Sequence, residues 1–182
     1  MNFKKYVLLV GLLVISSNSI AAGANKIKYV PNYKIGTGIA TFSNDIEYER
    51  NIIPFTTGYV RYGSASFDIP GASSVNASIT NLGYGVRYNL IFVYVGTGFE
   101  SSQITLKDST TNGQASGTIA GPIFEVGKTF GIGPISAGAA AGIQLATNKL
   151  SYDNNASFTV GDLNFNSSET LFKFEFYASL AF

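Results

Sequence analysis

Apolar and polar residues alternate along the last segment of the chain, residues 170–182. The apolar positions that share one parity include Phe172, Phe174, Phe176, Leu180 and Phe182. The opposite parity carries Lys173, Glu175, Tyr177 and Ser179. Because successive side chains of a strand point to opposite faces, this segment is predicted to be a strand with one apolar and one polar face.

The same alternation recurs along the rest of the chain, with glycine, Pro or Asn at the breaks. Including the last segment, it predicts eight strands, at residues 28–35, 40–50, 55–67, 77–88, 91–104, 117–130, 135–145 and 170–182. Pro31 weakens the first of these, and a bulge or local break is expected at Pro122, because proline cannot donate a ladder hydrogen bond. The fold is predicted to be all-β.

Short and long connections alternate between the predicted strands. The short turns lie near residues 52–54, 89–90 and 131–134, and the longer polar loops at residues 68–76, 107–116 and 149–169. Bacterial outer-membrane barrels have an even strand number, short periplasmic turns and longer outer loops. The chain has no run of 18 apolar residues after residue 22, which excludes helical membrane spans. The predicted fold is therefore an eight-stranded antiparallel up-and-down transmembrane β-barrel.

The first residues have the features of a secretory signal peptide. Lys4 and Lys5 precede an apolar run of residues 6–15, and Ser19 and Ala21 provide the small residues required for cleavage. We expect cleavage after Ala21, so that residues 1–21 are the signal peptide and residues 22–182 form the barrel. The apolar run is too short for a membrane-spanning helix.

Charge and cysteine content exclude several other classes of protein. The chain has 12 basic and 11 acidic residues, and loss of Lys4 and Lys5 would leave 10 and 11. A nearly neutral chain is not drawn to nucleic acid by its net charge. Because there is no cysteine, the mature chain can have neither a disulfide nor a cysteine-linked lipid anchor.

Several charged residues share the polar parity and are candidates for the interior of the barrel. They are Arg61, Arg87, Glu100, Glu125, Lys173 and Glu175, together with an acidic run of Asp45, Glu47 and Glu49. Buried charges must be paired, because an isolated buried ion is very costly. The lumen of an eight-stranded barrel is just wide enough for side chains to fill, which favours a plugged core. A gated polar path is the alternative.

The residue types argue against catalysis. The chain has no histidine, so neither a Ser–His nor an Asp–His arrangement can form, and imidazole cannot bind a metal. A site built of carboxylates alone, from the acidic run or from Glu100 with Glu125, is the remaining catalytic possibility, and paired structural charges explain these residues better. We expect no enzyme activity, no metal and no cofactor.

The longest predicted loop contains apolar residues among Asn and Ser. Its candidates for contact with a partner are Tyr152, Phe158, Leu163 and Phe165. In one interpretation, they form an exposed patch for a host surface or another ligand. In the other, the strands extend beyond the membrane and these side chains pack against one another.

Glycine–aromatic motifs carry a resemblance to a known family. The segments at residues 55–62, 83–89 and 93–99, followed by the aromatic last strand, resemble the small eight-stranded barrels of the outer membrane protein X and opacity-protein type. The last strand, ending on Phe182, resembles the signal that the barrel assembly machinery reads. The resemblance implies location in the outer membrane, contact with outer-membrane lipid and lipopolysaccharide, and no nucleic-acid partner.

Three functions remain open. The first is a structural or surface-interaction role through the outer loops, such as adhesion to a host ligand or resistance to host defences. The second is a narrow channel or binding barrel for a small or apolar solute. The third is a secreted, soluble barrel of lipocalin type, whose apolar face would point inward.

Overall fold

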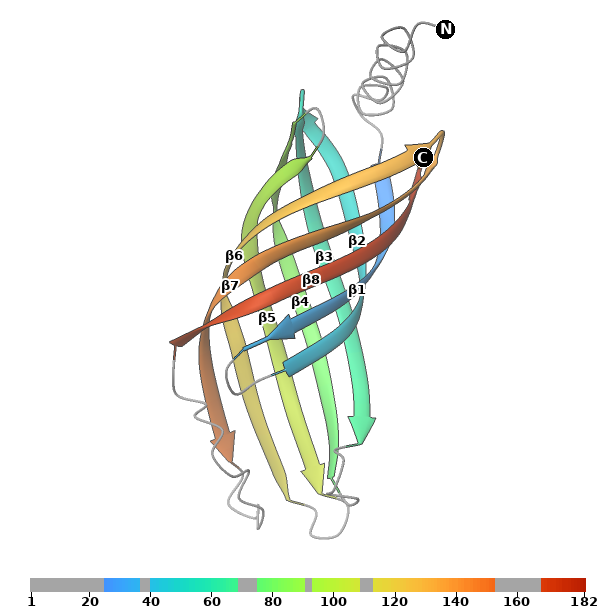
Figure 1. The fold of residues 1–182 in the computed structure, drawn as a ribbon. Helices are drawn as coiled ribbons and strands as arrows, with labels where there is room; N and C mark the ends of the chain where they lie inside the picture. The colour runs from blue at the N-terminus through green and yellow to red at the C-terminus, as the bar shows by residue number, and fades with distance from the viewer. Residues whose placement is uncertain (1–24, 37–39, 69–74, 91–92, 109–112, 153–167) are drawn as a thin grey trace, which may run out of the picture.

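Eight strands make up the computed structural model of the protein (Figure 1). The structure describes residues 25–36, 40–68, 75–90, 93–108, 113–152 and 168–182, so the predicted signal peptide lies outside the described residues. The strands are β1 (Asn25–Ile35), β2 (Ala40–Ile53), β3 (Thr56–Asp68), β4 (Val75–Asn89), β5 (Tyr94–Asp108), β6 (Gln114–Ile132), β7 (Ile135–Tyr152) and β8 (Ser168–Ala181).

Each strand pairs with its sequence neighbours in antiparallel orientation, and β1 pairs with β8 to close the barrel. The closing register runs from Lys26 opposite Ala181 to Ile35 opposite Phe172. This topology confirms the predicted eight-stranded up-and-down barrel. Closure matters because it leaves the sheet without a continuous free edge. Among the described residues, no helix is long and apolar enough to cross a membrane.

The two strand prolines interrupt pairing on one side without shifting the register. Pro31 pairs with Asn44 of β2, whereas the pairing of β1 with β8 passes from Tyr29 directly to Asn32. Pro122 likewise pairs with β5, and the pairing of β6 with β7 skips it. The predicted irregularity at Pro122 is therefore a local break, and no bulge forms there, because only the missing amide hydrogen bond has to be accommodated.

The strands are of unequal length, so one wall of the barrel is taller than the other. β6 and β7 have 19 and 18 residues, whereas β1 has 11. Figure 1 shows β3 to β7 reaching well past the last residues of β1 and the first residues of β2 at the end opposite the short turns. The predicted loops were therefore too long. Tyr152, which we expected in the longest loop, is the last residue of β7 and pairs with Ala115.

Apolar side chains surround the half of the barrel that lies nearer the short turns. Val60, Tyr84 and Phe176 are 55%, 57% and 61% exposed, and all three point outward. We call this surface the apolar band. It includes Ile27, Tyr29, Tyr33, Ile46, Tyr48, Tyr62, Leu82, Val86, Val95, Phe99, Phe124, Val126, Leu145, Phe172, Phe174 and Leu180. Such a surface is stable against lipid and unfavourable in water.

Beyond the apolar band the polarity of the two faces is reversed. We call residues 64–68, 75–80, 101–108, 114–119 and 146–152 of β3 to β7 the extension. Its outward positions include Ser64, Ser66, Asn76, Ser78, Thr80, Gln103, Thr105, Lys107, Gln114, Thr118, Thr147 and Lys149. Its inward positions are buried and mainly apolar, as at Ile79, Ile104 and Ile119. The extension thus has the inside-out pattern of a soluble β-protein.

This reversal predicts where a charge is tolerated on the outer face. Phe174→Lys places a charge in the apolar band and should destabilise the inserted barrel by about 2 to 4 kcal/mol. Gln103→Lys, at an exposed outward position of the extension, should leave the stability unchanged. The measurement is urea unfolding in phospholipid vesicles. Equal loss of stability in both variants would show that the band does not contact lipid.

Candidate functional site

All six charged residues predicted for the lumen point into it and are buried. Arg61, Glu100, Lys173 and Glu175 are each 0–1% exposed, and Arg87 and Glu125 are 2% and 5% exposed. The alternation explains this placement, because each shares its strand's inward parity with glycine or another small residue. The structure also brings in the predicted acidic run of Asp45, Glu47 and Glu49.

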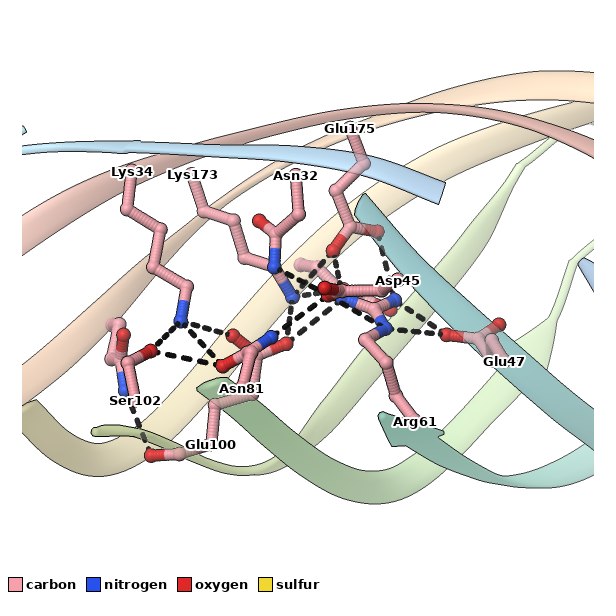
Figure 2. Close-up of polar contacts among 12 residues, drawn as sticks. Asn32, Lys34, Asp45, Glu47, Arg61, Asn81, Glu100, Ser102, Lys173 and Glu175 are labelled. Atoms are coloured by element: carbon pink, nitrogen blue, oxygen red, sulfur yellow. Dashed lines mark hydrogen bonds and ion pairs between the residues drawn. The ribbon is translucent and has the colours of Figure 1, made fainter. Parts of the chain in front are cut away.

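Arg61 lies at the centre of these charges and joins three carboxylates from different strands (Figure 2). Its Nε donates to Oε2 of Glu47 at 3.0 Å, and its Nη1 donates to Oε1 of Glu100 at 2.9 Å. Both Nη atoms donate to Glu175, with Nη2 at 3.1 Å from Oε2. The flat guanidinium can bridge several carboxylates because its donors point in fixed, divergent directions.

Two further cations extend the network towards the short turns and across the lumen. Arg87 donates through Nε to Glu125 at 2.6 Å and also bonds Glu47 and Glu49. Lys173 Nζ lies 2.6 Å from Glu100, 2.7 Å from Glu175 and 3.3 Å from Glu125. Each of these carboxylates therefore contacts at least one cation.

The sequence analysis missed two lysines of β1. Lys28 contacts Glu49 at 2.5 Å and Glu47 at 3.2 Å, and Lys34 contacts Glu100 at 2.8 Å. Both lysines have the opposite parity to the apolar residues Ile27 and Ile35, so they are expected on the inward face. The sequence contains this signal, but Pro31 obscured it. Neutral partners complete the network, namely Asn32, Asn81, Ser102 and Gln144.

The charges of this ionic network nearly balance. Five buried cations (Lys28, Lys34, Arg61, Arg87 and Lys173) face six buried carboxylates (Asp45, Glu47, Glu49, Glu100, Glu125 and Glu175). They come from β1 to β6 and from β8, while Gln144 of β7 donates to the main-chain oxygen of Glu100 at 2.9 Å. Chemically, such an arrangement cross-links strands around a filled lumen. Each of its carboxylates forms an ion pair with at least one cation, as is typical of a structural network.

Three inward tyrosines fill the lumen around the part of the ionic network that lies nearer the short turns. Tyr59, Tyr94 and Tyr177 are 3–5% exposed. Each ring occupies space that a neighbouring glycine leaves free. A Cβ on Gly127 would come within 2.4 Å of Tyr94, and one on Gly138 within 2.4 Å of Tyr177. Cations lie over the rings, with the Arg87 guanidinium carbon 4.0 Å from the Tyr59 centroid.

At the opposite end of the lumen, most of the buried side chains are apolar. The apolar plug, as we call it, is a cluster of small and branched side chains, made up of Ala77, Ile79, Ile104, Leu106, Ala115, Ile119, Ala146 and Leu171. The apolar plug was not predicted from the sequence, because polar residues were expected on the inward parity throughout. From the short turns outward, the lumen therefore holds tyrosines interleaved with ionic pairs, then further ionic pairs, then a mainly apolar layer.

The other predicted site residues do not join this network. Phe172, Phe174, Phe176, Leu180 and Phe182 point outward and are 45–65% exposed. The contact candidates Phe158, Leu163 and Phe165 lie outside the described residues. Within the described part of the chain, no group of three or more acidic side chains is arranged to hold a metal ion.

Comparison with known proteins relates the chain to others by fold alone. No family model and no curated protein matches the sequence. A major outer membrane protein from Thermus thermophilus is similar over 87% of this chain and 99% of its own, with 14% identity and a TM-score of 0.58. The attachment invasion locus protein Ail of Yersinia pestis, in complex with the heparin analogue sucrose octasulfate, is 10% identical, with 89% and 100% coverage and a TM-score of 0.53.

A third similar structure is Neisserial surface protein A, at 10% identity, 88% and 96% coverage and a TM-score of 0.51. The chain therefore has the fold of the small eight-stranded barrels of the bacterial outer membrane. This fold and the apolar band together make the protein an outer-membrane β-barrel, because an apolar surface around a closed barrel requires lipid.

The central position of Arg61 predicts a large effect of its removal. Arg61→Met leaves Glu47, Glu100 and Glu175 without the guanidinium that they share, which should cost about 3 to 5 kcal/mol of stability. The matched control is Lys107→Met, which removes an exposed cation from the extension. Urea unfolding in detergent micelles gives both values. If both variants unfolded at the same urea concentration as the parent protein, the ionic network would not support the fold.

Proposed function

We propose that the protein is a sealed outer-membrane barrel that contacts molecules outside the cell through the extension and the loops that follow it. The observation that carries this proposal is the extension itself. A barrel needs only an apolar outer surface to span the membrane, yet β3 to β7 continue beyond the apolar band with a polar outer face and a mainly apolar interior. A rigid scaffold of this kind presents loops for binding.

The outer face of the extension suits contact with a hydrated surface. Its outward side chains are mainly neutral hydroxyls and amides, and the two described cations among them are Lys107 and Lys149. Such groups can exchange hydrogen bonds with a polar macromolecule at little desolvation cost, since each retains water on its free side. The residues proposed for direct contact in the adjoining loop remain Phe158, Leu163 and Phe165, with Tyr152 at its border.

The packing of the lumen supports a sealed barrel over the alternative of a narrow channel. An ion crossing it would have to pass the apolar plug and then separate the pairs around Arg61, whose side chain is 1% exposed. Both steps are costly, since a bare ion is poorly solvated among apolar groups and a broken buried pair leaves an unpaired charge. We therefore propose neither transport nor catalysis.

Binding to a sulfated polysaccharide is a suitable first test, because Ail was crystallised with a heparin analogue. Cells that express the protein should be retained on immobilised heparin and on an epithelial cell layer more than cells with an empty vector. Deletion of residues 154–166 should reduce this retention while the barrel remains folded, since loop-closure entropy changes slowly with loop length. Folding is measured by the gel shift between boiled and unboiled samples.

The matched control is Phe174→Tyr, which changes the apolar band and leaves the extension and the loops intact. It should bind like the parent protein at equal surface expression. Retention at the level of the empty vector by the parent protein on both surfaces would contradict the proposed contact function. Retention that survives the deletion would instead assign contact to the extension or to the loops at residues 69–74 and 109–112.

A sealed lumen also predicts that the purified barrel does not conduct ions across a planar lipid bilayer. The triple variant Ile79→Ser, Ile104→Ser, Ile119→Ser opens the apolar plug to water and serves as a sensitive comparison. Reproducible single-channel currents from the parent protein would favour the channel alternative. The absence of currents in protein that shows the gel shift would support the sealed barrel.

A further inference from the structure

The three short turns carry exposed apolar side chains where a turn in water would ordinarily be polar. Ile132 is 92% exposed, Phe55 is 66% exposed and Ile135 is 65% exposed. We define the turn rim as Ile52, Ile53, Phe55, Leu90, Ile132 and Ile135, which lie at or beside the turns between β2 and β3, β4 and β5, and β6 and β7. The turn rim is continuous with the apolar band, since Phe130 and Val126 lead into it along β6.

The height of the apolar band indicates what covers this rim. On β4 the band runs from Leu82 to Tyr88, which reaches only about 16 Å along the membrane normal for a strand tilted by about 40°. The apolar surface of an outer-membrane barrel is about 25 Å tall. Adding Leu90 in the turn brings the β4 wall to about 21 Å. The apolar surface at β4 therefore approaches the thickness of the hydrocarbon layer only if the turn rim lies in lipid.

Two long cationic side chains lie in the apolar band next to the turn rim. Among the described outward positions of the apolar band, Arg50 and Lys128 are the charged ones. Lys128 lies between Val126 and Phe130, and its Nζ lies 4.6 Å from the centroid of the Phe130 ring, on the side of the turn. A lysine in the apolar band that extends in this direction can bring its ammonium group to the interface. At the membrane interface, the ammonium group can contact the phosphate of a phospholipid.

We propose that the turn rim is a lipid-binding surface that lies in the inner leaflet of the outer membrane. Its apolar side chains contact the upper acyl chains of phospholipids, and Arg50 and Lys128 contact their phosphates. The proposal rests on the outer-membrane location of the barrel. It means that the barrel is set off-centre, with the turn rim inside the bilayer and the extension wholly outside it.

The absence of tryptophan from the sequence allows a direct test of depth. Single tryptophans are introduced by Ile132→Trp and Phe55→Trp in the turn rim, Phe124→Trp in the middle of the apolar band, and Gln103→Trp on the extension. Each protein is folded into phosphatidylcholine vesicles brominated near the headgroup end of the acyl chains. Bromine quenches only tryptophans in contact with lipid, whereas acrylamide quenches those in water.

The two rim tryptophans should be quenched by the brominated lipid, protected from acrylamide and blue-shifted in emission. Gln103→Trp should behave in the opposite way. If Phe124→Trp were protected from acrylamide and the rim tryptophans were quenched only by acrylamide, the rim would lie in water and the proposal would be wrong. If Phe124→Trp were also quenched by acrylamide, the membrane location itself would be wrong.

A charge reversal tests the phosphate contact separately. Lys128→Glu should lower the urea concentration at which the barrel unfolds in phosphatidylcholine vesicles, and Lys128→Gln should lower it less. Lys107→Glu, on the extension, should leave it unchanged. Equal midpoints for Lys128→Glu and Lys107→Glu would show that Lys128 does not lie near the lipid phosphates.

Discussion

The barrel depends on ion pairing among the charges that its narrow lumen encloses. Five cations and six carboxylates are removed from water, and an unpaired ion in that place would cost more than the fold gains from many other contacts. The pairing works because the contacts run between strands, as when Arg61 of β3 reaches Glu100 of β5 and Glu175 of β8. The same contacts that satisfy the charges therefore hold distant parts of the wall at fixed distances from one another.

Side-chain size determines where each layer of the lumen can form. Glycine on one strand provides the space that tyrosine takes from another, as with Gly127 and Tyr94, so the lumen is filled without widening the barrel. At the opposite end, the strands leave the lipid, and the two faces exchange polarity. Small and branched residues such as Ala77, Ala115 and Ile119 then pack inside, because burial of apolar surface stabilises the extension as it does a soluble protein.

Alternation in the sequence predicted the strand number, the topology and the inward face at Arg61, because the parity of side chains is a local property. The strands were predicted too short on the side of the extension, because apolar residues were expected on the outward face throughout. In the extension Ile104 and Leu106 point inward while Gln103 and Thr105 point outward, so the alternation continues with its meaning reversed. The partner of each charge could not be predicted, because it depends on the register and the closure of all eight strands.

The sequence separation within the ionic network bears on how the barrel assembles. Arg61 and Glu175 are 114 residues apart and meet only when β8 has joined β1. Until that moment the guanidinium and its carboxylates are incompletely paired. An unclosed sheet that carries unpaired charges is unfavourable in the hydrocarbon layer of a membrane. Entry into the bilayer and closure of the last seam are thus thermodynamically coupled.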